Sequence, residues 1–303
     1  MTPEALPIVG RKTERERIQA CLRVGRNVLL EGPVGVGKTV LALAVAKDQG
    51  RPVFRIDGDS RYTEQKLVGG FDPPVVIKSG YGEEAFIPGP LVQAMREGGV
   101  LLLNELNRFP EGVQNVLLPA VDEGVILVPR LGEVHAHRDF RVVATQNPRE
   151  YVATSHLSEA ILDRFELIAL AYQSEAEELE ITQARVGSKF TTVDMGICAR
   201  SVALARATRG HPRVRRGASV RAAIAVAEIA HALLEGGAAT TAEEALSLAA
   251  AIGLANRVEL LPDLTETQGR DPLRMLLDEV GPKAGLGPAP VRGEGSLEKK
   301  KTH

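Results

Sequence analysis

The stretch GPVGVGKT, residues 32–39, holds the residues of this chain best suited to binding a phosphate. It satisfies the spacing G-x-x-x-x-G-K-[ST], with an apolar run before it and a helix-forming run after it. Glycines allow successive backbone N–H groups to converge on phosphate oxygens, and the lysine is expected to reach the β- and γ-phosphates. The threonine hydroxyl is the expected magnesium ligand. The predicted phosphate-binding residues are Gly32, Pro33, Val34, Gly35, Val36, Gly37, Lys38 and Thr39.

A second stretch, VLLLNELNR at residues 100–108, places two polar residues directly after a buried run. In open parallel sheets, ligands bind at the carboxyl ends of the strands, where Asn104 and Glu105 are expected. Glu105 can act as the base that polarises water, although an exposed strand-end carboxylate is the simpler alternative. Asn104 can accept a hydrogen bond from a magnesium-bound water. It brings no negative charge, so we expect weaker metal binding.

These residues need a scaffold, and the first 172 residues predict one. Apolar runs at 27–32, 52–58, 100–105, 140–146 and 166–170 alternate with helical stretches that begin at Lys38, Pro90, Pro110 and Ser158. Thr13 and Glu16 have capping-box spacing, which predicts a further helix from about residue 13. Apolar strands separated by helices are typical of an α/β fold in which helices cover a parallel sheet.

Two insertions and a change of composition complete the layout. Residues 71–90 and 124–140 each have turn residues between two short β-prone runs, which predicts two hairpins. From Gln173, helical periodicity without strand signals predicts a small all-helical lid domain over 173–280. Residues 281–303 are rich in Gly, Pro and Lys and predict a disordered tail.

Composition narrows the classes of partner. The 303 residues carry a formal net charge of -2, no Trp and only 4% aromatic residues, so nucleic acid is not the expected ligand. The two cysteines, Cys21 and Cys198, have no metal-ligand spacing and are expected to be buried, reduced thiols. We find neither an apolar signal core at the start nor a run of the ~20 apolar residues that span a bilayer. A cytoplasmic protein without a membrane span is the prediction.

The pair GPVGVGKT and VLLLNELNR, together with FIPGPLVQAMREGG before the second strand, resembles the MoxR family of AAA+ ATPases, with the NorQ/CbbQ and GvpN groups close to it. The resemblance extends from about Ile8 to Leu260. It implies a P-loop AAA+ core, the cofactors ATP and Mg²⁺, and an Asp-Glu pair where this chain has Asn104 and Glu105. Asn104 in place of that aspartate is expected to affect the strength of magnesium binding and the turnover rate.

The resemblance also implies roles for residues outside the two motifs. Asn147 is similar to the sensor 1 residue that contacts the γ-phosphate or the attacking water, although Asn-Pro is also a common turn. Arg164 is similar to an arginine finger offered to a neighbouring subunit; the alternative is a local ion pair with Asp163 or Glu159. Arg221 is similar to sensor 2. Further implied contacts, with the adenine, are Val9 and Gly10.

By resemblance, such a chain forms a homo-hexamer that remodels, matures or activates a client protein, with a von Willebrand factor A domain protein as the accessory partner. The alternative from another class is a nucleotide-gated scaffold with little or no hydrolysis, for which Asn104 argues. A DNA motor and a small-molecule kinase share the phosphate loop but explain the charge and the helical domain less well. His135 and His137 could pair as metal ligands, but no third ligand is evident and surface positions are expected.

Overall fold

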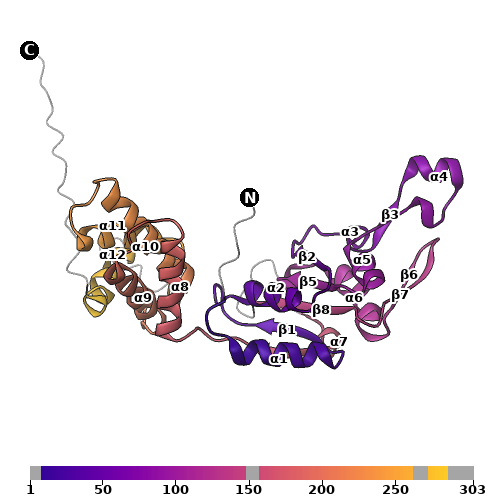
Figure 1. Cartoon of the computed structure of the whole chain (residues 1–303), viewed down its shortest axis with the longest axis horizontal. Coiled ribbons are helices and arrows are strands. Elements are labelled where there is room, and N and C mark those ends of the chain that lie inside the picture. Colours follow the sequence, from indigo (N-terminus) through magenta and orange to yellow (C-terminus); the bar gives the residue numbers. More distant parts are fainter. Residues whose placement is uncertain (1–7, 148–156, 262–271, 286–303) are drawn as a thin grey trace, which may run out of the picture. The chain divides into compact units, whose positions relative to one another are not determined.

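The computed structural model of the chain describes residues 8–147, 157–261 and 272–285. The described residues divide into two compact units, one within Gly10–Tyr172 and one from Gln173 onward that also includes Ile8 and Val9 (Figure 1). The first unit is an α/β structure and the second is mostly helical. The phosphate loop and the 100–108 stretch both belong to the first unit.

A five-stranded sheet in the order β2-β5-β8-β1-β9 forms the centre of the first unit (Figure 1). All neighbouring pairs are parallel, which confirms the predicted α/β P-loop fold. The three central strands are almost wholly buried because apolar residues occupy both of their faces. The strands are β1 (Asn27–Glu31), β2 (Val53–Asp57), β5 (Val100–Asn104), β8 (Arg141–Gln146) and β9 (Phe165–Ala169).

Helices flank this sheet where the sequence predicts them. Helix α1 packs on β1 and β9, α2 packs on β1, β5 and β8, and α5 packs on β2 and β5. The capping-box prediction at Thr13 was wrong: α1 begins one residue earlier, and its N-cap is Arg11 in the left-handed conformation, without a side-chain cap. The helices are α1 (Lys12–Arg23), α2 (Lys38–Asp48), α3 (Glu64–Val68), α5 (Pro90–Glu97), α6 (Glu111–Asp122) and α7 (Glu159–Leu162), with 3-10 turns η1 (Glu83–Ala85) and η2 (Leu106–Arg108).

The two insertions project from the same end of this unit (Figure 1). The second is the predicted hairpin, in which β6 (Val125–Val128) pairs antiparallel with β7 (Gly132–His135). The first insertion matches the hairpin prediction only in part. Strands β3 (Gly69–Phe71) and β4 (Phe86–Pro88) pair antiparallel, but α4 (Pro73–Ser79) lies between them. Two prolines at its first positions preset helical φ, so the Val-Val-Ile run that looked β-prone continues as helix.

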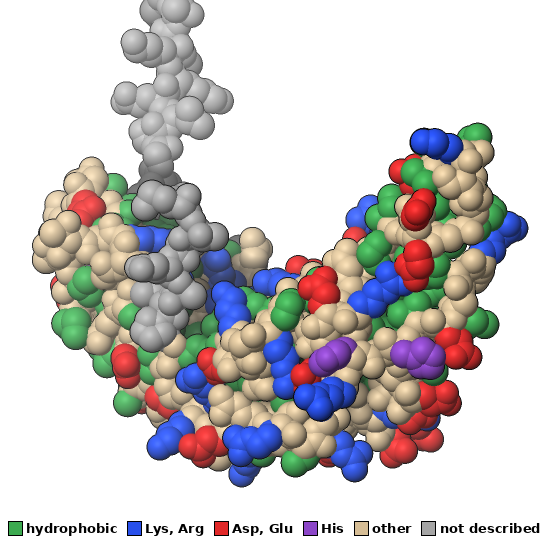
Figure 2. Space-filling model, turned by 45° about the vertical axis from the view of Figure 1, so that its right-hand side comes forward, with side chains coloured by type: hydrophobic (Ala, Val, Ile, Leu, Met, Phe, Trp, Pro, Cys, Tyr) green, Lys and Arg blue, Asp and Glu red, His purple; other side chains and the backbone are tan. Residues whose placement is uncertain are grey.

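Apolar side chains are exposed on these insertions. Ile77 on α4 is 88% exposed, Leu127 on β6 is 76% exposed and Ile87 on β4 is 59% exposed. The projecting part at the right of Figure 2 carries hydrophobic side chains interspersed with basic and acidic ones, and the rest of this face is also mixed in charge. The insertions therefore offer apolar contact area beside charged groups.

The second unit is built from α8 (Glu175–Gly187), α9 (Met195–Arg209), α10 (Val220–Glu235), α11 (Ala242–Leu254) and α12 (Pro272–Val280). The all-helical prediction was wrong in one respect, because β10 (Val214–Arg216) pairs antiparallel with β11 (Glu259–Leu260). The predicted disordered tail begins too early, because the 3-10 turn η4 (Pro282–Ala284) follows α12 and buries Ala284. The rest of the predicted tail, 286–303, lies outside the described residues.

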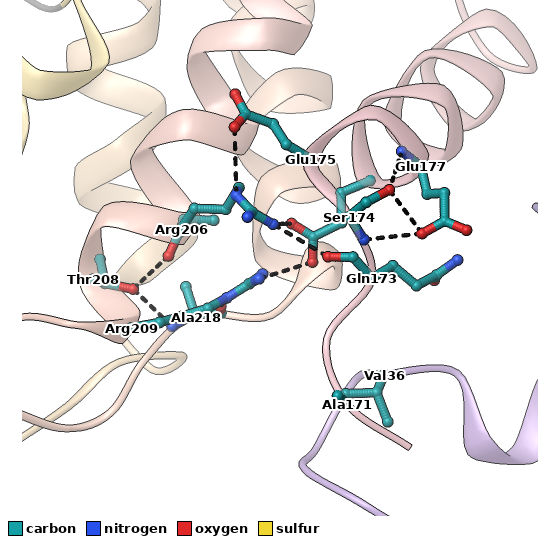
Figure 3. Close-up of polar contacts among 12 residues, drawn as sticks. Val36, Ala171, Gln173, Ser174, Glu175, Glu177, Arg206, Thr208, Arg209 and Ala218 are labelled. Atoms are coloured by element: carbon teal, nitrogen blue, oxygen red, sulfur yellow. Dashed lines mark hydrogen bonds and ion pairs between the residues drawn. The ribbon is translucent and has the colours of Figure 1, made fainter. Parts of the chain in front are cut away.

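A buried carboxylate joins two helices of this unit (Figure 3). Glu178 on α8 is only 2% exposed, and it pairs with Arg206 at 3.2 Å and with Arg209 at 2.9 Å, both on α9. Arg209 also donates to the Ala218 carbonyl at 2.7 Å, and the Thr208 hydroxyl accepts from the Ala218 N–H at 2.8 Å. The network thus fixes the segment that leads into α10.

Both cysteines are free thiols, as predicted. Cys198 is fully buried in the core of the helical unit, and this burial raises the pKa of its thiol to about 11. The predicted burial was wrong for Cys21, which is only half-buried on α1. In the described part of the chain, no helix combines the length and the apolar character needed to cross a membrane.

Candidate functional site

The phosphate loop connects β1 to α2 and has the backbone of an anion cradle. Gly35 and Gly37 have φ of 80° and 92°, in the left-handed region that glycine adopts without strain. Gly37 is the N-cap of α2, so the free N–H groups of that helix open onto the loop. Lys38 Nζ donates to the carbonyls of Gly32 at 2.6 Å and Pro33 at 2.8 Å, which holds its charge against the same loop.

Behind the loop, Thr39 is hydrogen-bonded to the end of β5. Its hydroxyl donates to Asn104 Oδ1 at 2.6 Å, and the Thr145 hydroxyl at the end of β8 donates to the same oxygen at 2.9 Å. The Thr39 hydroxyl gives its only proton to Asn104, so its oxygen keeps lone pairs with which it can ligate a cation. Oxygen donors of this kind are those that Mg²⁺ prefers, so Thr39 fits the predicted magnesium site, whereas the two lone pairs of Asn104 Oδ1 are taken by the two hydroxyls in this structure.

Asn104 has a third partner, on the strand to its other side. Asp57 ends β2 and lies opposite Asn104 in the parallel register of β2 and β5. Asn104 Nδ2 donates to Asp57 Oδ1 at 2.8 Å, and the Arg55 side chain also donates to that oxygen. Partial burial by itself raises the pKa of Asp57, but the hydrogen bonds from Arg55 and Asn104 outweigh burial and lower it.

Glu105 has a strained backbone held by its surroundings. Its φ of 58° and ψ of 57° are left-handed, which costs a non-glycine residue about 1–2 kcal/mol. The Glu105 N–H donates to Thr145 Oγ at 3.0 Å, and the carboxylate pairs with Arg108 at 2.7 Å. A Cβ at Gly58 would lie 2.3 Å from the Glu105 carbonyl oxygen, so only glycine fits there. Strain fixed from several sides is typical of functional residues.

A buried arginine supports the phosphate loop from the amino-terminal side. Arg11 is 8% exposed and donates to the Val36 carbonyl at 3.1 Å and to the Ala171 carbonyl at 2.6 Å. It also pairs with Glu14 at 2.7 Å. Burial alone raises the pKa of Glu14, but the hydrogen bond and charge of Arg11 outweigh burial and lower it. Arg11 thereby ties the loop to the segment after β9.

The structure places the remaining predicted residues without assigning them a role. Asn147 is 5% exposed just beyond β8, and its carbonyl accepts from Asn107 Nδ2 at 3.3 Å. Arg164 pairs with Asp122 at 2.6 Å, neither of the two partners considered above, and donates to the Ala160 carbonyl at 2.7 Å. These positions neither support nor exclude a sensor or an arginine finger.

The roles predicted for Arg221, Val9 and Gly10 also stay predictions. Arg221 lies exposed at the start of α10 and makes no hydrogen bond or ion pair within the described ranges. The Val9 carbonyl accepts from Gln173 Nε2 at 2.7 Å, and Gly10 has φ of 66°. Nothing in these contacts identifies an adenine pocket.

The two histidines are on the surface, at and beyond β7. His135 is near Glu133 at 3.2 Å and His137 is near Asp139 at 3.7 Å. The described residues hold no group of three His, Cys, Asp or Glu side chains that could bind a metal.

Comparison with known proteins agrees with this geometry. Residues 27–165 match the family model described as AAA domain (dynein-related subfamily). The gas vesicle ATPase GvpN of Ancylobacter aquaticus is 30% identical over 254 residues, which cover 76% of this chain and 70% of that protein. This chain belongs to the MoxR family of AAA+ ATPases, close to GvpN. The P-loop and nucleotide-binding character predicted from the sequence are confirmed with it.

Other similarities within and beyond the MoxR family are more limited. The GvpN of Haloferax mediterranei is 34% identical over 211 residues, but the match covers 63% of this chain and only 60% of that relative. A RuvB mutant of Thermotoga maritima superposes with a TM-score of 0.57 at 17% identity, over 80% of this chain and 70% of that one. At this identity the likeness concerns the fold.

Sequence reasoning missed four residues of the site: Arg11, Asp57, Gly58 and Thr145. Thr145 had a signal, since it is a hydroxyl in the buried run FRVVATQ. Asp57 had a weaker one, as an acidic residue at the end of another predicted strand. The pairing of β2 with β5, which brings Asp57 beside Asn104, could not be derived from spacing.

Proposed function

We propose that this chain is a MoxR-like ATPase that couples the binding and hydrolysis of Mg-ATP to the remodelling, maturation or activation of a partner protein. The observation that carries the proposal is the continuous set of hydrogen bonds from Thr39 through Asn104 and Thr145 to the Glu105 backbone. It links the phosphate loop to the strand end that carries the candidate base. Family membership supports the same activity.

The residues divide the chemical work among them. The loop amides and Lys38 would bind and orient the β- and γ-phosphates, while Thr39 and Asn104 would hold the magnesium ion. When bound, that ion would offset charge that develops on the transferred phosphoryl group. Glu105 would accept a proton from the attacking water, for which it must leave Arg108 or share its carboxylate with it. Asn147 would position that water.

The proposal extends to an assembly. Arg164 acting on a neighbouring subunit requires a ring, for which a homo-hexamer is our hypothesis, and Arg221 would report the γ-phosphate to the helical unit. The exposed Ile77, Leu127 and Ile87 on the insertions are the apolar contacts available to a client or to an accessory protein with a von Willebrand factor A domain. We place this activity in the cytoplasm.

A specific observation also favours a second candidate, a nucleotide-gated scaffold that hydrolyses little or no ATP. Asn104 contributes no charge to the metal site, and the Glu105 carboxylate is paired with Arg108. Both features lower the hydrolytic capacity of an otherwise complete binding site. Such a protein would change its contacts on binding ATP rather than on turnover.

Steady-state ATPase activity distinguishes the two candidates. Mg²⁺ is titrated from micromolar to tens of millimolar concentrations for the wild type, Glu105→Gln and Asn104→Asp. If the wild type hydrolyses ATP and Glu105→Gln does not, the chain is the proposed ATPase. If the wild type binds ATP but turns it over as slowly as Glu105→Gln, the scaffold is supported instead. Lys38→Ala is the control: loss of ATP binding in this variant shows that the nucleotide binds at the phosphate loop.

A further inference from the structure

The side chain of Asn104 has only one orientation that satisfies its neighbours. Its amide faces Asp57 on one side and the hydroxyls of Thr39 and Thr145 on the other. A carboxylate accepts hydrogen bonds but cannot donate them, so the NH₂ group must face Asp57. The amide oxygen therefore points at the two hydroxyls. Without the carboxylate, the amide could rotate and direct its NH₂ group at the Thr39 oxygen, in competition with a cation.

Asp57 also places a negative charge next to this neutral amide. The hydrogen bonds that Arg55 and Asn104 donate to it all go to Oδ1, and Oδ2 has no hydrogen-bond partner among the described residues. Its side chain is 60% exposed, so solvent or a hydrated cation can reach that second oxygen. The pair with Arg55 is itself exposed and contributes little to stability.

We infer that Asp57 is a positioning residue of the metal site: it orients Asn104 toward Thr39 and supplies, from the neighbouring strand, the negative charge that Asn104 lacks. A carboxylate at the end of β2 thus stands beside the position at the end of β5 where an acid is expected. This inference rests on the proposed binding of Mg²⁺ with a nucleotide, but it does not require hydrolysis.

The test is a double-mutant cycle read out by nucleotide binding. ADP affinity is measured by isothermal titration calorimetry, with Mg²⁺ and with EDTA, for the wild type, Asp57→Asn, Asn104→Asp and the double variant that exchanges the two residues. We expect Mg²⁺ to strengthen ADP binding by the wild type, and Asp57→Asn to reduce that gain about tenfold, which corresponds to about 1.4 kcal/mol. The exchanged double variant should recover it to within about threefold.

Asp59→Asn is the matched control. It removes a carboxylate two residues further along, which pairs with Arg61 and makes no hydrogen bond to Asn104. Its effect on the Mg²⁺ gain should be small. Affinity for ADP in EDTA reports an intact phosphate loop in every variant, so a folding defect is recognised as a loss in both buffers.

Three results would overturn the inference: no Mg²⁺ gain in the wild type, an unchanged gain in Asp57→Asn, or a double variant as impaired as Asp57→Asn alone. The last would show that the carboxylate cannot be exchanged between the strands. Failure of the proposed function would look different: the protein would not turn over ATP, but Mg²⁺ would still strengthen its binding of ADP.

Discussion

Thr145 connects both residues of the β5 strand end to β8 through one hydroxyl. It donates to Asn104 Oδ1 and accepts from the Glu105 N–H, and it is fully buried. Thr145→Val keeps the shape but leaves that N–H without an acceptor, which costs about 1–3 kcal/mol. We expect a lower melting temperature in calorimetry and at least a tenfold loss of ATPase activity, because Glu105 loses its fixed backbone.

Thr145→Ser retains the hydroxyl and serves as the matched variant. It should recover most of the activity even if the lost methyl group lowers stability. Equal activity losses in the valine and serine variants would mean that packing, not hydrogen bonding, is what β8 contributes to the site.

Gly58 gives a second prediction at this scale. A methyl group there meets the Glu105 carbonyl oxygen at 2.3 Å and the Arg108 Cβ at 3.1 Å. Gly58→Ala should therefore displace Glu105, destabilise the protein by about 1–3 kcal/mol and reduce kcat more than ADP affinity. Gly82→Ala is the control, because that glycine has extended backbone and open space around it. A harmless Gly58→Ala would show that Glu105 tolerates displacement.

The sequence could predict residues whose role follows from local spacing, and it failed where the role depends on strand neighbours. Lys38, Thr39, Asn104 and Glu105 belong to short motifs, each adjoining a recognisable apolar strand. Asp57 and Thr145 acquire their roles only because β2 and β8 are the two neighbours of β5. Strand order is a long-range property that hydrophobic periodicity does not contain.

At the scale of elements, helices α8 and α9 are joined by a charge buried between them. Glu178 is 2% exposed and pairs with Arg206 and Arg209, and Arg209 also fixes the approach to α10 through the Ala218 carbonyl. Glu178→Ala leaves two arginines without their shared carboxylate and should cost about 3 kcal/mol. Calorimetry should show a lower transition temperature for the helical unit.

Glu180→Ala, at an exposed position on the same helix, should change stability by less than about 0.5 kcal/mol. If the two variants are equally mild, the buried carboxylate contributes no more than a surface charge. An intact phosphate-loop unit, tested by ADP binding in the Glu178 variant, would locate the damage in the helical unit.

Elements with a clear local pattern, an apolar run or a helical repeat, were predictable, and elements without one were not. The sheet strands and α8–α11 follow apolar runs or helical repeats of ten or more residues. Helix α4 was misread because Val and Ile favour strands in general, whereas two prolines at its start decide locally. The pair β10–β11 joins segments more than forty residues apart, each two or three residues long, and no local pattern announces it.

At the scale of the whole molecule, the question is whether the site is complete within one chain. Arg164 is the residue on which this depends. In the structure its guanidinium pairs with Asp122 of the same chain, and its side chain is 30% exposed. An exposed ion pair of this kind is worth little, so the arginine can exchange Asp122 for the phosphate of a neighbouring subunit at small cost.

Mixing inactive variants tests this arrangement. Lys38→Ala cannot bind the phosphates but keeps Arg164, whereas Arg164→Ala keeps an intact nucleotide site but lacks the arginine. Each variant alone should therefore be inactive. If Arg164 acts on the neighbour in a ring, random co-assembly of equal amounts joins an intact site to an intact arginine at about a quarter of the interfaces. The mixture should therefore recover up to about a quarter of wild-type ATPase activity per subunit.

Lys38→Ala mixed with Glu105→Gln is the control for this experiment. Both of these residues belong to the same β1–β8–β5 site within one chain, so no pairing of subunits restores a complete site, and the mixture should stay inactive. Recovery in the Arg164 mixture alone places the arginine in trans and makes an assembly necessary for turnover. No recovery after verified subunit exchange would instead leave Arg164 as the partner of Asp122, because a residue acting within its own chain cannot be supplied by a neighbour.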